Sequence, residues 1–519
     1  MPTPAGTGGA LRERRRGQRA PHPEVPPAVC GVGEGVAPAG AYNGWVSTTL
    51  TRRDLAAACL AALPAPAVEV RPNLLLILSD DHSVPFLGAY GDPVIRTPNL
   101  DRFASQGMRF DRAFTAAPQC VPSRAALMTG RSPVAVRMGR FSSPLPPDVV
   151  TLPELLRGQG YFTGICRRIF HLDGPGKVGA VTGPIFEKYN LLTFDRRVDF
   201  LDRGSPRAQT VAKVNEFFDK RPKDRPFFLW ISFNDPHHVW DRNAIPQPHD
   251  PKKLVLPPYL PDLPGVREDL GRYCDEVARM DEEFQWVMNI LEQRGVASDT
   301  LVAFMGDNGL AFPHGKGSLY DPGLNVPLMV RWPGRVNPGS SSSELISGED
   351  LAPTMLEAAG LPVPKEISGR SFLRLLRGQS HQERQYIFGA RLAHGNSAYT
   401  PKTRANTFDL SRCVRSKKFK LIYNCTPQQI HAPVDSANDP SWREIVAAHE
   451  AGTLAPAFER AYFTQPRPVI ELFDLEKDPA ELNNLAGQPE FAAIERELKI
   501  ALQEKMILDY DFLPLPLNE

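Results

Sequence analysis

One run of aliphatic residues that ends in two carboxylates constrains the fold more than any other feature of the sequence. Residues 74–78 read Leu-Leu-Leu-Ile-Leu, and Asp80 and Asp81 follow after a single serine. An uninterrupted apolar run of this length predicts a strand buried on both faces, as at the parallel centre of an α/β sheet. Ligand sites in such sheets lie at the carboxyl ends of the strands. Adjacent carboxylates repel each other unless a cation holds them, so the pair indicates a metal site; a solvated turn is the alternative.

A second apolar run, more than 200 residues further along the chain, ends in the same way. Residues 301–305 read Leu-Val-Ala-Phe-Met and lead into Asp307 and Asn308. On its own, Asp-Asn-Gly is more often a turn. Two buried strands that both end in oxygen donors favour two halves of one divalent metal site. Ca²⁺ or Mg²⁺ is expected, because no cluster of cysteine or histidine ligands accompanies them.

The composition excludes several classes of protein. Of the 519 residues, 42% are apolar and 23% are charged, which is typical of a globular chain and too apolar for one that is disordered throughout. The net charge of +1 gives no overall attraction to nucleic acid or to an acidic membrane surface. No apolar run reaches the roughly 18 residues that cross a bilayer, so no integral membrane segment is expected. The 52 prolines favour long, stiff connections, as in an enzyme whose site is built from loops.

The cysteines do not form a recognisable framework. There are seven, none in a C-x-x-C pair, so the sequence gives no support for a zinc ribbon or a thioredoxin-like site. An odd number argues against a complete set of disulfides. Cys413 and Cys425 could pair, and the sequence leaves that open.

The first 70 residues differ from the rest of the chain. Residues 1–45 are rich in Gly, Pro, Ala and Arg, and this predicts a disordered leader. Residues 51–67 contain twin arginines, a short apolar stretch and small residues, and they resemble a twin-arginine export signal. Export to the periplasm is therefore expected, with translation starting near Val46. A chance arginine pair in a cytoplasmic protein is the alternative.

Between the two strands lies the segment that carries a family resemblance. Residues 116–131 contain C-x-P-x-R from Cys120 to Arg124, followed by T-G-R. This resembles the signature of the type I, formylglycine-dependent sulfatases. Residues 97–104 and 471–479 resemble further blocks of the same family, so the similarity covers roughly residues 71 to 486.

The resemblance implies an architecture. It is the alkaline-phosphatase-like fold of the α/β class, with a large mixed sheet flanked by helices and a smaller C-terminal α+β subdomain. We expect the leader over residues 1–70, the catalytic domain over 71–375 and the subdomain over 376–519.

The resemblance also implies a nucleophile and a cation. In this family a separate formylglycine-generating enzyme oxidises the motif cysteine, so Cys120 would become an aldehyde that is present as its hydrate. One hydroxyl of the hydrate would attack sulfur, and the other would later expel sulfate. Arg124 would lower the pKa of the hydrate. Without the motif, Cys120 would be read as a small buried thiol. Finally, the resemblance implies that Asp80, Asp81, Cys120, Asp307 and Asn308 form the ligand set for Ca²⁺, with Mg²⁺ as the alternative.

Three further positions match the family less uniformly. Many relatives have G-K-x-H or G-K-x-x-H after the next strand, with lysine and histidine contacting the sulfate, whereas this chain has Arg167, Arg168 and His171. Arginine keeps the charge of lysine but presents a planar fork, so the role of Arg168 departs from the pattern while His171 matches it.

Two basic residues in later blocks complete the catalytic set that the resemblance implies. His237, in an Asp-Pro-His block, would be a general acid for the leaving group, with His238 as the weaker candidate. Lys316 would bind the sulfate as a point charge. Away from these motifs, His238 and Lys316 would be read as solvated loop residues.

The branch of the family is less clear than its membership. The interval from Asp307 to Lys316 resembles the heparan N-sulfatase (N-sulfoglucosamine sulfohydrolase) branch, whereas the Arg-x-Phe-His variant resembles the iduronate-2-sulfatase branch. A sulfated carbohydrate is the expected substrate. One alternative is a phosphonate monoester or phosphodiester hydrolase with the same nucleophile. Another is a catalytically inactive glycan-binding homologue, which only the Arg167-Arg168 departure favours.

A few elements outside the motifs can also be predicted. Residues 273–294 carry an apolar stripe at helical spacing, which indicates a helix packed on the core. Residues 350–360 and 490–505 predict two more helices, and residues 418–423 predict a strand.

Overall fold

The computed structural model describes residues 71–139, 144–168, 182–394 and 409–514. All of them belong to one compact unit that spans residues 70–519. The predicted leader and the export-like segment at 51–67 lie outside the described residues.

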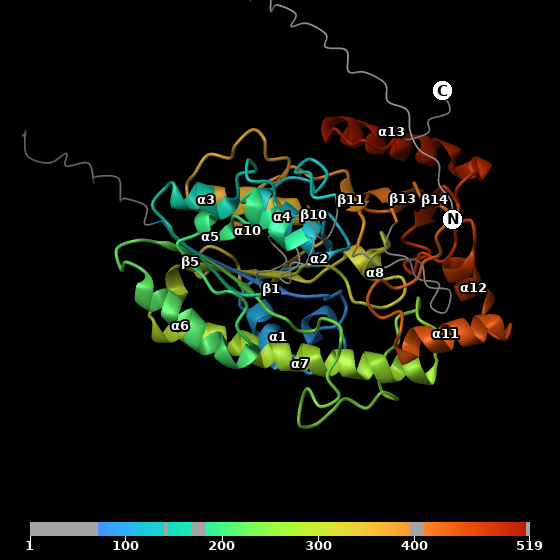
Figure 1. The fold of residues 1–519 in the computed structure, drawn as a ribbon, viewed down its shortest axis with the longest axis horizontal. Coiled ribbons are helices and arrows are strands. Elements are labelled where there is room, and N and C mark those ends of the chain that lie inside the picture. Colours follow the sequence, from blue (N-terminus) through green and yellow to red (C-terminus); the bar gives the residue numbers. More distant parts are fainter. Residues whose placement is uncertain (1–70, 140–143, 169–181, 395–408, 515–519) are drawn as a thin grey trace, which may run out of the picture. The chain divides into compact units, whose positions relative to one another are not determined.

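The centre of the molecule is an eight-stranded mixed sheet with the strand order β5-β4-β6-β1-β7-β8-β2-β9 (Figure 1). Strands β5, β4, β6, β1 and β7 run parallel, β8 is antiparallel to both of its neighbours, and β9 is parallel to β2. The bounds are β1 Asn73–Ser79, β2 Met108–Phe110, β4 Phe162–Arg167, β5 Phe200–Leu201, β6 Phe227–Ser232, β7 Thr300–Gly306, β8 Leu328–Arg331 and β9 Ser340–Ser342. The two apolar runs that end in carboxylates are thus the neighbouring central strands β1 and β7, as predicted.

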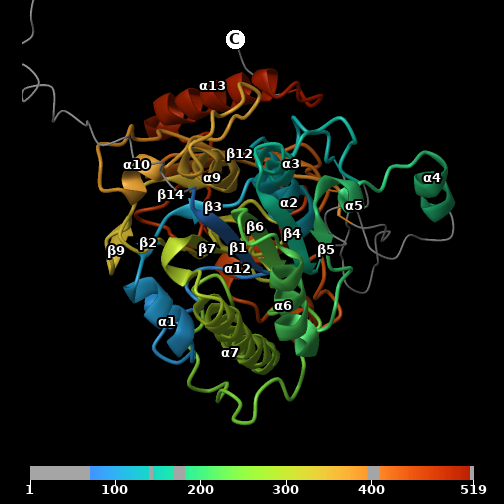
Figure 2. The same ribbon diagram turned by 90° about the vertical axis from the view of Figure 1, so that its left-hand side faces the viewer.

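Helices cover both faces of this sheet (Figures 1 and 2). Alternate residues of β1 explain why: Leu75 and Ile77 pack into one hydrophobic cluster, and Leu74, Leu76 and Leu78 pack into another. The first cluster includes side chains of α1 (Pro98–Ser105), α6 (Thr210–Lys220) and α7 (Pro264–Gln293), and the second includes those of α2 (Cys120–Thr129), α3 (Leu152–Arg157), α9 (Leu351–Ala358) and α10 (Leu373–Leu376). A core on both faces of the sheet requires a central strand with apolar residues at successive positions.

The longest helix extends beyond its predicted bounds. The sequence predicts residues 273–294, whereas α7 begins at Pro264 and ends at Gln293. Its first turns carry Arg267, Glu268 and Arg272, which hide the apolar period. Contacts distant in sequence stabilise these turns instead: the Gly265 backbone N–H donates to Glu444 at 2.7 Å.

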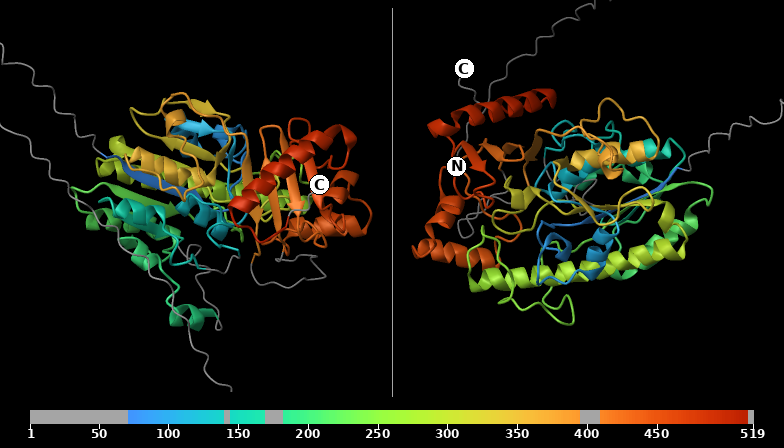
Figure 3. Two further views of the ribbon diagram at one scale, coloured as in Figure 1. Left: turned by 90° about the horizontal axis from the view of Figure 1, so that it is seen from above. Right: turned by 180° about the vertical axis from the view of Figure 1, so that it is seen from behind.

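A smaller antiparallel sheet follows in the C-terminal region, with the order β11-β12-β13-β14. Its strands are β11 Ile387–Arg391, β12 Ser411–Arg415, β13 Phe419–Asn424 and β14 Ile470–Asp474. Helix α13 (Ala492–Leu508) packs on one face, and the other face packs against side chains of the main domain (Figure 3). The predicted strand 418–423 and the predicted helices 350–360 and 490–505 are confirmed with shifts of a few residues at their ends. The boundary at residue 375 stays a prediction.

The remaining elements are short or belong to connections. They are β3 Ala113–Phe114 and β10 Ile346–Ser347, which form a two-stranded sheet, and the helices α4 Thr182–Lys188, α5 Phe194–Arg197, α8 Asp321–Leu324, α11 Pro440–Glu450 and α12 Pro456–Phe463. Cys413 and Cys425 are both free, so the disulfide that the sequence left open does not form. Within the described ranges, no helix has the length and apolar character that a membrane span requires.

Candidate active site

Four neighbouring parallel strands deliver most of the predicted site residues to one edge of the sheet. Asp80 and Asp81 follow β1, Asp307 follows β7, Arg168 follows β4 and His237 lies in the loop after β6. Because parallel strands present their carboxyl ends at the same edge, residues far apart in sequence meet there.

The carboxylates form a fully buried group. Asp80, Asp81, Asp307 and Asn308 are each 0% exposed. The backbone N–H of Asp81 donates to Asp307 Oδ1 at 3.0 Å, and Asn308 Nδ2 donates to Asp81 Oδ1 at 2.9 Å. Asp81 has a φ of 64°, in the left-handed region where aspartate is one of the few tolerated side chains. The ends of β1 and β7 are therefore tied together through their side chains.

Cys120 is the first residue of α2, and its thiol faces the same carboxylates. The sulfur lies 3.2 Å from Asp80 Oδ1 and 3.7 Å from Asp81 Oδ1. Burial, and then the charge of Asp80, raise the pKa of the Cys120 thiol well above its ordinary value. As a cysteine, this residue is therefore a neutral thiol and a poor nucleophile.

Arg124 lies one helical turn after Cys120 and bridges two carboxylates. Its Nε is 2.8 Å from Asp307 Oδ2 and its Nη2 is 3.0 Å from Asp80 Oδ2. Its Nη1 donates to the Ser232 hydroxyl at the end of β6. Burial alone would lower the pKa of Arg124, but Asp307 and Asp80 hold it above its ordinary value. The C-x-P-x-R spacing thus places thiol and guanidinium on the same face of α2, as i and i+4 positions require.

The two arginines after β4 take different directions. Arg168 Nε lies 2.8 Å from Asp80 Oδ2, so Arg168 joins the site. Arg167 instead pairs with Glu283 of α7 at 3.0 Å. Its φ of 74° lies where glycine is normally favoured, and glycine is the residue that many relatives have there. The departure from the family pattern therefore adds a structural ion pair and still leaves a cation in the site.

Lys316 and His237 complete the cluster on the Asp81 side. Lys316 Nζ lies 2.7 Å from Asp81 Oδ1 and donates to His237 Nε2 at 3.3 Å. Asp435 and Asp81 hold the pKa of Lys316 well above its ordinary value against the effect of burial. Burial lowers the pKa of His237 to about 4. In this arrangement His237 is a neutral acceptor, and it would need a proton before it could act as an acid.

Of the two other predicted histidines, one can be placed, and it does not enter this cluster. His171 lies outside the described residues. His238 turns to the C-terminal region, where its Nε2 lies 2.6 Å from Asp439 Oδ2 and its ring packs edge-on against Trp240.

The structure also adds residues that no motif indicated. Asp435, from the loop before α11, has Oδ2 2.6 Å from Lys316 Nζ and Oδ1 3.2 Å from His394 Nε2. Ser232 is a second addition, through its contact with Arg124. Neither stands in a recognisable pattern, although the polar end of an apolar strand could have singled out Ser232.

The donor set suits a hard divalent cation. Asp80, Asp81, Cys120 and His237 each offer a ligand atom within 4.8 Å of the others. Asn308 Oδ1 is buried and accepts no hydrogen bond from the described residues. Burial and the neighbouring Asp80 raise the pKa of Asp307 to about 7, a sign of repulsion that a cation would relieve. Oxygen ligands at this density are those that Ca²⁺ and Mg²⁺ prefer.

Comparisons with known proteins agree with this geometry. The family described as Sulfatase matches residues 72–361, and the family described as N-sulphoglucosamine sulphohydrolase, C-terminal, matches residues 312–461. The chain is 29% identical to human N-sulphoglucosamine sulphohydrolase, over 85% of this chain and 91% of that protein. It is 30% identical to human arylsulfatase A (82% and 86%) and 28% identical to an ulvan-active sulfatase of Formosa agariphila (86% and 77%).

Solved structures resemble the chain at lower identity. One, a protein in complex with its substrate D-glucosamine-2-N,6-O-disulfate, has a TM-score of 0.63 at 21% identity and covers 86% of this chain and 99% of its own. Another, the phosphonate monoester hydrolase of Agrobacterium radiobacter, has a TM-score of 0.61 at 19% identity, with 85% and 96% covered. These likenesses confirm the predicted alkaline-phosphatase-like fold.

Proposed function

We infer that this chain, which belongs to the sulfatase family, hydrolyses the sulfate ester or sulfamate of a carbohydrate with a formylglycine nucleophile derived from Cys120. One observation carries the proposal: the Cys120 sulfur lies 3.2 Å from Asp80 in a fully buried group of carboxylates that also holds Arg124.

The unmodified thiol does not suit the reaction, since its pKa is raised and its charged form is disfavoured. Conversion to formylglycine, by a formylglycine-generating enzyme acting as a transient partner, would supply a geminal diol that can attack sulfur and later release sulfate. Arg124 and Asp80 contact the position of this group and would orient it. Because Arg124 stays charged, it would also stabilise the hydroxyl in its deprotonated form.

Asp80, Asp81, Asp307 and Asn308 are the residues that would hold Ca²⁺, or alternatively Mg²⁺, with the Cys120-derived side chain beside them. Such a cation polarises sulfate oxygens and the nucleophile. The free Oδ1 of Asn308 and the crowding of the carboxylates support this assignment.

The remaining side chains would bind the sulfate and the leaving group. Lys316 and Arg168 place positive charge on either side of the carboxylates. His237 would receive a proton when the substrate binds and would pass it to the departing oxygen or nitrogen. His171 stays a predicted contact to the sulfate.

The charge of the site fits a singly charged ester. Among the described residues, Asp80, Asp81, Asp307 and Asp435 face Arg124, Arg168 and Lys316, so a divalent cation would leave one net positive charge on this group. A sulfate ester carries one negative charge, and so do a phosphonate monoester and a phosphodiester. The charge of the site therefore does not separate the two reactions, and phosphonate monoester hydrolysis is the second candidate. The similarity to a solved phosphonate monoester hydrolase supports it only through the shared fold.

Within the family we propose a glucosamine derivative that carries an N-sulfo group. The match over residues 312–461 and the human N-sulphoglucosamine sulphohydrolase support this narrower assignment. The third reading, an inactive glycan-binding homologue, rests only on the Arg167-Arg168 departure, and the pairing of Arg168 with Asp80 weakens it.

We also propose that the protein is exported to the periplasm by the segment at residues 51–67. Fractionation of cells that produce the full chain, with and without an Arg52→Lys, Arg53→Lys double substitution, tests this. Export predicts that only the unsubstituted chain reaches the periplasm, and equal distribution would contradict it.

The test of the function is sulfate release by protein whose Cys120 conversion has been verified by peptide mass. N-sulfoglucosamine, an O-sulfated glucosamine, an aryl sulfate and a phenylphosphonate monoester form the panel, with Cys120→Ala as the control. The proposal predicts the highest kcat/KM on N-sulfoglucosamine and none in the control. Preference for an O-sulfate would remove the branch assignment alone, whereas preference for the phosphonate would remove the sulfatase assignment.

A further inference from the structure

A carboxylate from the C-terminal region reaches the sulfate-binding side of the site. Asp435 Oδ2 lies 2.6 Å from Lys316 Nζ. The side chain of Asp435 is 22% exposed, whereas that of Lys316 is 1% exposed. Asp435 is therefore the more solvent-exposed partner of this ion pair.

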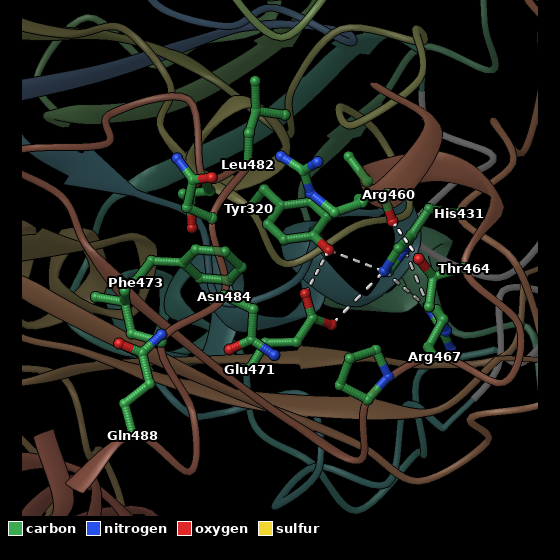
Figure 4. A pocket seen from close by; sticks show the side chains of 15 residues that line it. Tyr320, His431, Arg460, Thr464, Arg467, Glu471, Phe473, Leu482, Asn484 and Gln488 are labelled. Carbon is green, nitrogen blue, oxygen red and sulfur yellow. Dashed lines mark hydrogen bonds and ion pairs between the residues drawn. The ribbon is translucent and has the colours of Figure 1, made fainter. Parts of the chain in front are cut away.

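The position of Asp435 is fixed on its N-terminal side by a buried polar network. His431 Nε2 lies 2.8 Å from the Tyr320 hydroxyl, and Arg467 Nη1 lies 3.1 Å from His431 Nδ1 (Figure 4). The Tyr320 hydroxyl also donates to Glu471 of β14 at 2.7 Å. These contacts line a cavity of about 320 Å³ and hold the start of the loop against the C-terminal sheet.

The loop is also held on the C-terminal side of Asp435. The Ser436 hydroxyl donates to the carbonyl of Ala311, four residues after Asp307 in the site. The Ser441 backbone N–H donates to Asp269 of α7 at 2.8 Å. Because both ends are anchored, the fold itself places the Asp435 carboxylate, and a substrate meets it in a fixed position.

The consequence is electrostatic. A lysine ammonium with a carboxylate at 2.6 Å presents less net charge to a ligand than the same ammonium alone. Removing the charge of Asp435 adds one positive unit to the site whether or not a cation is bound. This added positive charge matters most for a ligand that carries two negative charges. The first negative charge of such a ligand is already matched by the remaining cationic groups.

We propose that Asp435 is a specificity-determining residue that makes the site select singly charged esters and disfavour dianionic ones such as phosphate monoesters. The inference rests on the proposed function, because it assumes that Lys316 binds the sulfate group. It gives the C-terminal region a role in choosing the charge of the substrate's reacting group.

A merely structural role for Asp435 makes a different prediction. If Asp435 only held Lys316 in place, its loss would weaken the binding of every anion to a similar extent. Asp435→Asn separates the two cases, since asparagine keeps an oxygen that can accept from Lys316 and removes the charge.

The experiment measures binding, so that it does not depend on turnover. Phenyl sulfate and phenyl phosphate are titrated by calorimetry into Cys120→Ala protein at pH 8 with calcium, with and without Asp435→Asn. Phenyl phosphate is then a dianion, because the second pKa of a phosphate monoester is about 6. Asp439→Asn is the matched control, since Asp439 is on the same loop with the same 22% exposure but pairs with His238 rather than Lys316.

Asp435→Asn is expected to raise the affinity for phenyl phosphate about tenfold relative to the affinity for phenyl sulfate, which corresponds to about 1.4 kcal/mol. Asp439→Asn should leave that ratio within about twofold. A parallel loss of affinity for both ligands, an equal change in the control, or no binding of either ligand would each overturn the inference. If the affinity ratio changes as expected but the protein releases no sulfate from any substrate, the proposed reaction is wrong and the charge selection by Asp435 stands.

Discussion

Arg279 of α7 holds the loop that carries His237, and its removal should destabilise the protein in a pH-dependent way. Its Nε and Nη2 lie 2.7 and 2.9 Å from the two carboxylate oxygens of Asp235, two residues before His237. Its Nη1 lies 2.6 Å from Asp241, and its Nη2 lies 3.1 Å from Glu276. Arg279→Gln would leave three acidic side chains around one neutral side chain.

The magnitude follows from burial. Breaking a buried ion pair costs about 3–5 kcal/mol. The side chain of Arg279 is 19% exposed and that of Asp235 is 8% exposed, so the expected loss at pH 8 is nearer 2–3 kcal/mol after solvent screening is allowed for. Unfolding entropy of about 2.1 cal/mol/K per residue over the roughly 450 residues of the compact unit converts this into a Tm decrease of about 2–3 °C.

The sign of the pH dependence is set by Glu276. Burial, and then Asp235, raise the pKa of Glu276 to about 8, and Arg279 counteracts that shift. A carboxyl group whose pKa is raised on folding binds more protons in the folded state than in the unfolded state. Its destabilising effect therefore grows as the pH rises above the ordinary pKa of the group. Without Arg279 the pKa rises further, and the Tm difference between variant and wild type should be larger at pH 8 than at pH 5.5.

Scanning calorimetry of both proteins at pH 5.5, 7 and 8 measures this difference. Arg294→Gln is the control, because its pair with Asp219 is exposed and contributes less than about 1 kcal/mol. A Tm difference that is independent of pH, or one that is larger at pH 5.5, would refute the reasoning.

Three further predictions concern the site. Gly309→Ala should lower the Tm far more than Gly139→Ala. An added Cβ at residue 309 would lie 1.9 Å from a backbone oxygen of α8, whereas one at residue 139 meets nothing within 4 Å. Equal Tm values for the two variants would contradict this. Calcium at 100 times its Kd should stabilise the protein by about 2.7 kcal/mol, and Asp307→Asn should abolish most of the resulting Tm increase; an unchanged increase in the variant would exclude Asp307 as a ligand. Arg168→Gln should lower kcat/KM by about 10²–10³-fold, whereas Arg167→Gln should spare kcat/KM. Both should lower the Tm, because each removes one partner of a buried ion pair. A loss of kcat/KM in Arg167→Gln and not in Arg168→Gln would show that the two arginines have been assigned to the wrong places.

The sequence predicts the parts of the site that local patterns determine. An apolar run followed by aspartates identifies β1 and β7, since a strand buried on both faces has no room for a polar period. The C-x-P-x-R spacing places Cys120 and Arg124 on one face of a helix for the same local reason. The regular strand ends then bring Asp80, Asp81, Asp307 and Asn308 together, as parallel pairing requires.

Contacts between distant segments were beyond the reach of these patterns. Asp435 lies in a loop with no motif, and contacts of that loop with the C-terminal sheet and with the main domain bring it to Lys316. The first turns of α7 are polar in sequence and are stabilised by α11. Arg167 and Arg168 are adjacent and chemically equivalent, and only their contacts, with Glu283 and with Asp80, distinguish their roles.

The central claim is that the reaction depends on formylglycine at position 120. The most direct measurement is the rate of sulfate release from N-sulfoglucosamine by preparations in which different fractions of Cys120 have been converted, the fraction being read from the mass of the peptide that contains it. The account predicts a rate proportional to the converted fraction and no release from fully unconverted protein. A rate that is independent of conversion, or full activity in Cys120→Ala, would contradict it.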